Sequence, residues 1–189
     1  MLLTFDVGAK QYEPLYEADL QAAWTAITAI ESDYVLFFNC GKDGGCSRLR
    51  KHMQLIPMPK GTFASFLDGE GQEPEVPFQW YHRRFPRERN VTVEDVIEIY
   101  NELLEQATEV GKGKAEHAEM LPSGAACPHN MILTKSWMIV LPRRKNGELG
   151  ASAVGMLGYI AVSSEEEVDE WVKGGINNTM REFGVPRVV

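Results

Sequence analysis

The sequence has few cysteines and no long apolar segment. Cys40, Cys46 and Cys127 cannot all pair within one chain, so they exclude a disulfide framework and indicate a reducing compartment. No apolar run approaches the roughly 18 residues of a membrane span, and no charged-plus-apolar secretory signal is visible. We therefore predict a protein that does not contact membranes and that lies in the cytoplasm, or also in the nucleus.

The sequence also lacks an excess of basic residues. It has 19 Lys and Arg against 27 Asp and Glu, and the net charge of −8 argues against general nucleic-acid binding, which needs a basic face. A local cationic group can still bind a nucleotide. One such group surrounds the Gly-rich segment described below: Lys42, Arg48, Arg50 and Lys51.

Metal-binding spacings are missing as well. Cys40, Cys46, His52, Cys127 and His129 include no C-x-x-C pair, and their gaps do not match a standard zinc finger. The Gly-rich segment has no Gly-Lys-Ser/Thr ending, so it is not a P-loop. We expect no metal site.

The order of the periodic segments predicts one α+β domain over residues 1–189. Apolar residues recur at helical spacing over residues 18–30, 92–110, 164–171 and 176–183. Strand-length apolar runs cover residues 2–5, 34–38, 51–57, 78–85, 131–134, 137–141 and 151–162, and residues 61–77 are typical of a surface loop. The short connection between the second and third runs predicts an antiparallel pair.

Residues 39–57 carry most of the chemistry. A Gly-rich loop leads into a predicted strand, whose alternation places Arg50, His52 and Gln54 on one face. An imidazole and a carboxamide would then lie beside a loop whose N–H groups can gather around an anion. A neutral imidazole there can attack phosphorus, although the spacing alone fits an ordinary strand with a surface histidine equally well.

The segment NCGKDGGCSRLRKHMQLIPMP resembles the signature of the diadenosine tetraphosphate phosphorylases, also called ATP adenylyltransferases. They belong to the histidine-triad and galactose-1-phosphate uridylyltransferase superfamily. The family pattern is approximately N-x-G-x-x-x-G-A-S-Q-P-H-K-H-L-Q, and this sequence matches it at Asn39, Gly41, Gly45, Ser47, Lys51, His52 and Gln54. Residues 2–24, 128–143 and 154–171 and the closing GVPR are similar to the family too, so the resemblance covers nearly the whole chain.

The resemblance implies a histidine-triad-like antiparallel sheet with helices packed against it. It implies that His52 accepts a nucleotidyl group on its imidazole nitrogen and that Gln54 assists at the bound phosphate. The nucleotide and phosphate would be held by Asn39, Gly41, Gly45, Ser47, Arg50 and Lys51, with Arg50 the stronger candidate of the two cations because alternation turns Lys51 away from His52.

The implied reaction is phosphorolysis or cleavage of diadenosine polyphosphates, and the reverse adenylyl transfer. The implied partners are the nucleotide and phosphate. No cofactor is required, and a divalent cation such as Mg²⁺ can accompany the nucleotide.

The sequence departs from the family pattern near the predicted nucleophile. Arg50 replaces the first histidine, Arg48 and Leu49 replace Gln-Pro, and the chain begins inside what would be a mid-domain strand. Two alternatives therefore stay open. One is a divergent superfamily member that acts on another phosphorylated substrate, and the other is a catalytically silent nucleotide-binding or scaffold protein.

Other side chains near these segments have no motif of their own. Cys46 lies in a glycine-rich loop beside cationic residues, which can lower the pKa of a thiol, or it is a tolerated small side chain. The isolated histidines His82 and His129 are more typical of structural groups. Trp80 lies on a segment that resembles a strand beside the family's pocket, so it is a candidate for base stacking.

The start of the chain leads to one expectation about assembly. With Leu2, Leu3 and Phe5 in an edge strand, we expect an exposed apolar edge that a homodimer would bury. The alternative is a monomer in which residues 61–77 cover that edge.

Overall fold

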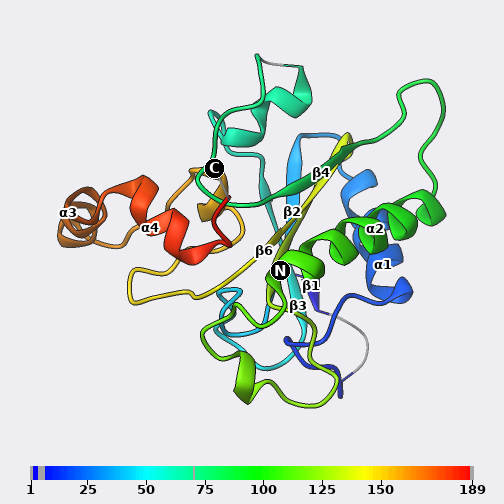
Figure 1. Ribbon diagram of the computed structural model, residues 1–189. Helices are drawn as coiled ribbons and strands as arrows, with labels where there is room; N and C mark the ends of the chain where they lie inside the picture. Colours follow the sequence, from blue (N-terminus) through cyan, green and yellow to red (C-terminus); the bar gives the residue numbers. More distant parts are fainter. Residues whose placement is uncertain (1, 4–6, 70, 188–189) are drawn as a thin grey trace.

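The computed structural model describes residues 2–3, 7–69 and 71–187. Its strands form one 6-stranded antiparallel sheet in the order β1-β3-β2-β5-β6-β4 (Figure 1). The strands are β1 (Leu2–Leu3), β2 (Tyr34–Cys40), β3 (His52–Pro57), β4 (Tyr81–Arg84), β5 (His129–Leu133) and β6 (Trp137–Pro142). The expected pairing of β2 with β3 is confirmed, while Phe5 lies outside the described residues.

The longer helices divide between the two sides of the sheet. Helices α1 (Glu17–Thr28) and α2 (Val93–Gly111) lie on one side, and α3 (Glu165–Gly174) and α4 (Ile176–Phe183) lie on the other (Figure 1). Short 3₁₀ helices are η1 (Phe63–Asp68), η2 (Ala118–Met120) and η3 (Gly155–Leu157). The expected α+β class is therefore confirmed. None of the helices in the described ranges is both long and apolar enough to cross a membrane.

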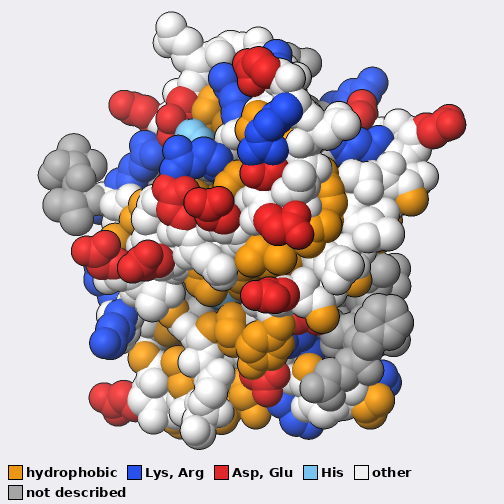
Figure 2. Space-filling view, turned by 90° about the vertical axis from the view of Figure 1, so that its right-hand side faces the viewer, with side chains coloured by type: hydrophobic (Ala, Val, Ile, Leu, Met, Phe, Trp, Pro, Cys, Tyr) orange, Lys and Arg blue, Asp and Glu red, His pale blue; other side chains and the backbone are white. Residues whose placement is uncertain are grey.

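Helix α2 shows how the local sequence determines where a helix begins and which side it buries. Its N-cap Thr92 accepts a hydrogen bond from the Asp95 backbone N–H at 3.3 Å, and the Asp95 carboxylate accepts from the Thr92 N–H at 2.8 Å. Val96, Tyr100 and Leu103 then recur on one side and are buried against the sheet. Figure 2 shows the outside of this region, with acidic side chains spread over it and basic ones mostly near one end.

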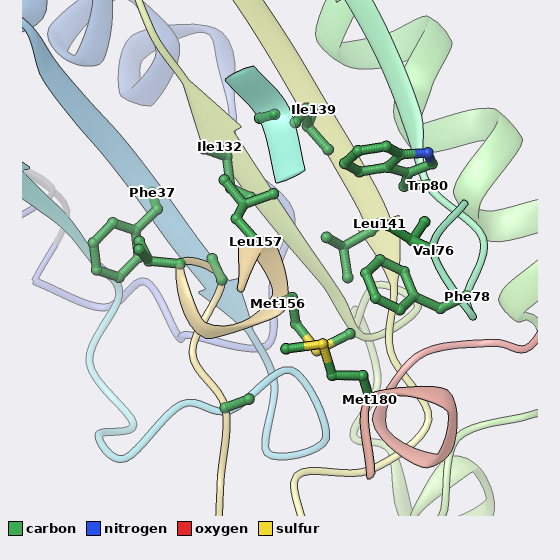
Figure 3. Close-up of a cluster of buried hydrophobic side chains, with 14 of the residues drawn as sticks. Phe37, Val76, Phe78, Trp80, Ile132, Ile139, Leu141, Met156, Leu157 and Met180 are labelled. Atoms are coloured by element: carbon green, nitrogen blue, oxygen red, sulfur yellow. The ribbon is translucent and has the colours of Figure 1, made fainter. Parts of the chain in front are cut away.

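The opposite face of the sheet carries a second buried core (Figure 3). Phe37 of β2, Ile132 of β5 and Ile139 of β6 form its floor. Irregular segments and short helices supply its cover, including Val76, Phe78, Trp80, Met156, Leu157 and Met180. This face is therefore closed by connecting segments as much as by α3 and α4.

Two expectations about these connecting segments were wrong. Residues 61–77 are not only a surface loop, because η1 and its surroundings bury Phe66, Leu67 and Val76. Residues 151–162 do not form a strand: their backbone–backbone hydrogen bonds are local, such as Met156 N–H to Ser152 O at 3.0 Å, and they build η3. Gly158 then turns the chain at φ +90°, a conformation that glycine adopts readily.

Candidate active site

His52 begins β3 and has a buried side chain. Its ring Nδ1 lies 2.9 Å from the Arg50 carbonyl oxygen. A carbonyl oxygen can only accept a hydrogen bond, so Nδ1 carries a proton, and in the neutral ring Nε2 is the nitrogen with the lone pair. The imidazole is thus held in the tautomer that a nucleophile attacking through Nε2 requires.

Gln11 fastens the main chain of His52, a role that no pattern in the sequence indicated. Its side-chain Oε1 accepts from the His52 N–H at 2.6 Å, and its Nε2 donates to the His52 carbonyl at 3.0 Å. The same Nε2 donates to the Asn39 carbonyl at 2.9 Å. The pairing of β2 with β3 ends at Phe37 and Gln54, and beyond that point the Gln11 carboxamide connects the two strands.

Asn39 lies within β2, on the same side of the sheet as Phe37. Its Oδ1 accepts two hydrogen bonds, from Asn130 Nδ2 at 3.0 Å and from the Ala153 N–H at 2.9 Å. Its Nδ2 has no acceptor among the described residues, although the residue is only 5% exposed. The site therefore holds an amide donor that lacks a partner in the described part of the chain, on the strand next to that of His52.

The Gly-rich loop folds back on itself between β2 and β3. Gly41 and Gly45 have φ angles of +74° and +87°, and the Cys46 N–H reaches back to the Gly41 carbonyl at 3.2 Å. A Cβ on Gly44 would come within 2.1 Å of the Cys40 carbonyl oxygen, so this position has no room for a side chain.

The remaining predicted ligands differ in access. Ser47 and Arg50 are exposed next to the loop, and Gln54 is half-buried on β3. Their expected contacts with a phosphate stay predictions, as do those of Gly41 and Gly45.

Lys51 requires a correction to the predicted ligand set. Its side chain is fully buried, with Nζ 3.2 Å from the Asp19 carboxylate and 2.7 Å from the Pro14 carbonyl. It also lies 4.1 Å from the centre of the Tyr16 ring. An ammonium held by a buried carboxylate inside the fold is not accessible to a phosphate at His52, so we remove Lys51 from the ligands.

The segment that follows α2 contacts the Gly-rich loop at Asp43. The buried Asp43 carboxylate accepts from His117 Nδ1 at 2.6 Å and from the His117 backbone N–H at 3.0 Å. Together with Glu116 these groups place ligand atoms within 4.8 Å of one another, the spacing of a cation site. Lys42 Nζ lies 3.1 Å from His117 Nε2, so the positive charge of a lysine is already next to these ligand atoms. We therefore infer that Asp43 and His117 hold the loop in place rather than bind a metal ion.

The cysteines are free thiols, as expected. Burial raises the pKa of Cys46 above its ordinary value, so the surrounding cations do not activate it. This agrees with the interpretation of Cys46 as a small side chain that the loop tolerates.

Two ring side chains considered from the sequence, those of His129 and Trp80, serve the fold. Burial lowers the pKa of His129 to about 4, and its ring contacts the Cys127 carbonyl and the Tyr100 hydroxyl on the helix-covered side. Trp80 is buried against Phe66 and His82, so its ring is not a free platform for a base.

Comparison with known proteins identifies the family. The Ap4A phosphorylase N-terminal domain matches residues 2–66, and the ATP adenylyltransferase C-terminal domain matches residues 74–186. This chain belongs to the Ap4A phosphorylase and ATP adenylyltransferase family. The resemblance that residues 39–57 carry is thereby confirmed, and the His52 motif lies within the N-terminal match.

Two similar curated proteins come from Saccharomyces cerevisiae. Diadenosine 5',5'''-P1,P4-tetraphosphate phosphorylase 2 is 25% identical over 188 residues, which cover 84% of this chain and 57% of that protein. Protein APA1 is 26% identical over 213 residues, which cover 98% of this chain and 64% of that protein. The chain therefore spans less than two thirds of the length of these relatives.

A solved structure shares the fold. The crystal structure of yeast Ap4A phosphorylase Apa2 in complex with Ap4A has a TM-score of 0.77 and 21% sequence identity, covering 96% of this chain and 67% of that chain. The expected histidine-triad-like sheet with packed helices is confirmed by this likeness.

Proposed function

We propose that the chain transfers a nucleotidyl group through His52, with diadenosine polyphosphates as the substrate class. The observation that carries the proposal is the His52 ring, whose Nδ1 is bound to the Arg50 carbonyl at 2.9 Å and whose Nε2 is left as the nucleophile. Membership of the family supports the substrate class, since a similar protein is a diadenosine tetraphosphate phosphorylase.

The reaction proceeds in two displacements. His52 Nε2 attacks the α-phosphorus, an N–P bond forms, and the P–O bond to the leaving nucleoside polyphosphate breaks with its electron pair on the leaving oxygen. An oxygen of inorganic phosphate then attacks the same phosphorus and the N–P bond breaks, which returns the neutral imidazole. From diadenosine tetraphosphate the products are ATP and ADP, and the reverse reaction is adenylyl transfer.

The neighbouring donors would stabilise the charge that gathers on phosphorus in each step. Asn39 Nδ2 is positioned as an unpartnered donor, and Ser47, Arg50 and Gln54 are accessible around His52. None of these steps needs a resident cofactor, and a divalent cation would enter with the polyphosphate. The expected homodimer stays a prediction.

The test is covalent labelling with α-³²P-ATP or an α-labelled dinucleoside polyphosphate. We expect acid-labile label on the wild-type protein and none on His52→Ala. His82→Ala is the matched control, because His82 is a half-exposed histidine outside the motif, and it should keep the label. Equal labelling of wild type and His52→Ala would rule out the assignment, and an unlabelled wild type would reject the proposed reaction.

A further inference from the structure

Arg143 is a buried cation at the end of β6, beyond the motif that carries the chemistry. Its side chain is 0% exposed, and within the described ranges no carboxylate lies within the 4.0 Å of an ion pair. Among the described residues its guanidinium donates to uncharged oxygens, including the carbonyls of Ala151 at 2.8 Å and Lys145 at 3.1 Å. Burying a charge without an opposite charge costs folding free energy, which suggests that Arg143 has a function in the site.

The guanidinium connects to Asn39 through Asn130. Arg143 Nη1 donates to Asn130 Oδ1 at 2.6 Å, and Asn130 Nδ2 donates to Asn39 Oδ1 at 3.0 Å. A guanidinium has donors only, so it forces the oxygen of the first amide toward itself and the nitrogen of that amide toward Asn39. In the same way, the Asn130 nitrogen can only donate, so the Asn39 oxygen faces Asn130 and the Asn39 nitrogen faces away from it.

The second contact on Asn39 depends on the same guanidinium. The Ala153 N–H also donates to Asn39 Oδ1, at 2.9 Å, and the segment that carries it is held by the bond from Arg143 Nη1 to Ala151 O. Both donors that orient Asn39 are therefore placed by Arg143. Asn39 Nδ2 remains without an acceptor among the described residues, and it is not one of their fully buried unpaired atoms, so a ligand can reach it although the residue is only 5% exposed.

We propose that Arg143 is a positioning residue, which sets the direction of the Asn130–Asn39 amide chain so that Asn39 Nδ2 donates to a bound phosphate. The inference rests on the proposed function, because it assigns this phosphate to the nucleotide at His52. Burial lowers the pKa of Arg143 to about 9, which leaves the group charged at neutral pH. Its charge polarises the two amides and strengthens the terminal donor, which the phosphate would satisfy.

Asn130→Asp tests the direction of the chain. The carboxylate keeps the contact with Arg143, now as an ion pair, but it cannot donate to Asn39 Oδ1 and instead accepts from Asn39 Nδ2. The matched control is Asn101→Asp on the exposed side of α2, which adds the same charge away from the chain. Thermal unfolding checks that both variants fold.

The readout is the side-chain amide signal of Asn39 in ¹⁵N-labelled protein, titrated with inorganic phosphate and with AMP. We expect the signal to shift in the wild type and in Asn101→Asp, and to stop responding in Asn130→Asp, with the affinity for AMP reduced about tenfold to a hundredfold. A response in Asn130→Asp that merely needs more phosphate would indicate charge repulsion alone and overturn the proposal. So would a wild-type signal that ignores both ligands.

Arg143→Lys carries the same test if Asn130→Asp does not fold. A single ammonium keeps the charge but cannot reproduce the planar fork that reaches Asn130 and Ala151, so the Asn39 response should again be lost. Retention of the full response in Arg143→Lys would contradict the inference. Labelling of His52 separates the two proposals: an unlabelled wild type whose Asn39 signal still responds would reject the reaction and leave the role of Arg143 standing.

Discussion

The face of the sheet under α1 and α2 is closed by regular helices, whereas the opposite face is closed largely by connecting segments and short 3₁₀ turns. Buried polar side chains gather at one end of the second face, where Asn39 follows the apolar positions of β2 while His52 and Asn130 precede those of β3 and β5. The comparison shows a division of work. Both faces carry a buried apolar core, but the candidate active site lies on the irregular side, where loops can bring backbone donors to a site.

A pair of matched leucines should separate these two tasks. Leu103 of α2 and Leu157 of η3 are each 1% exposed, so Leu103→Ala and Leu157→Ala should both lower the unfolding free energy by about 2–5 kcal/mol. Only Leu157→Ala should also weaken phosphate binding, since η3 follows the segment whose Ala153 N–H holds Asn39. Urea unfolding and phosphate titration measure the two effects. Equal loss of binding in both variants would show that the faces are not independent.

Acid should destabilise the protein through the helix-covered face. The pKa of His129 falls from its ordinary value of 6.5 to about 4 because the ring is buried, so between these pH values the unfolded chain binds a proton that the native state does not. Stability is therefore lost as the pH falls from 6.5 to 4, by about 3 kcal/mol from this group. His129→Asn should remove that part of the pH dependence in chemical unfolding. An unchanged slope would reject the assignment.

Arg50 tests the exposed end of the other face. Its guanidinium offers a planar fork suited to phosphate, so Arg50→Ala should weaken phosphate or nucleotide binding by about 1.5–3 kcal/mol. Arg50→His restores the histidine of the family pattern, so it should make the reaction of this protein more like that of the family. Arg181→Ala, an exposed arginine on α4, is the control and should leave binding unchanged. Calorimetric titration that finds Arg50→Ala as tight as wild type would refute the role.

A substitution of Gln11 tests the connection that its carboxamide makes between β2 and β3. Gln11→Ala leaves the His52 N–H and two carbonyls without their partner, which should cost about 1–3 kcal/mol of unfolding free energy and slow the labelling of His52. Gln21→Ala on the exposed side of α1 provides the control. If the two variants unfold and react alike, the carboxamide does not position His52.

The sequence by itself determined the elements whose signals are local. The helical spacing of Val96, Tyr100 and Leu103 predicted α2, because one face of a helix must be apolar to pack on a sheet. The alternation that places His52 and Gln54 together follows from strand geometry alone, and the motif around them indicated the family. These conclusions depend on residues close together in the chain.

Only the tertiary structure decided which polar side chains complete the site. Gln11 meets Asn39 across 28 residues of sequence, and Ala153 meets Asn39 across 114, so no local pattern could indicate either contact. Long-range packing also decided that Lys51 serves the fold, because Asp19 of α1 neutralises it in the interior. Residues 151–162 have the composition of a strand, but they contain η3 instead, because their backbone–backbone hydrogen bonds are local and their apolar side chains cover the core.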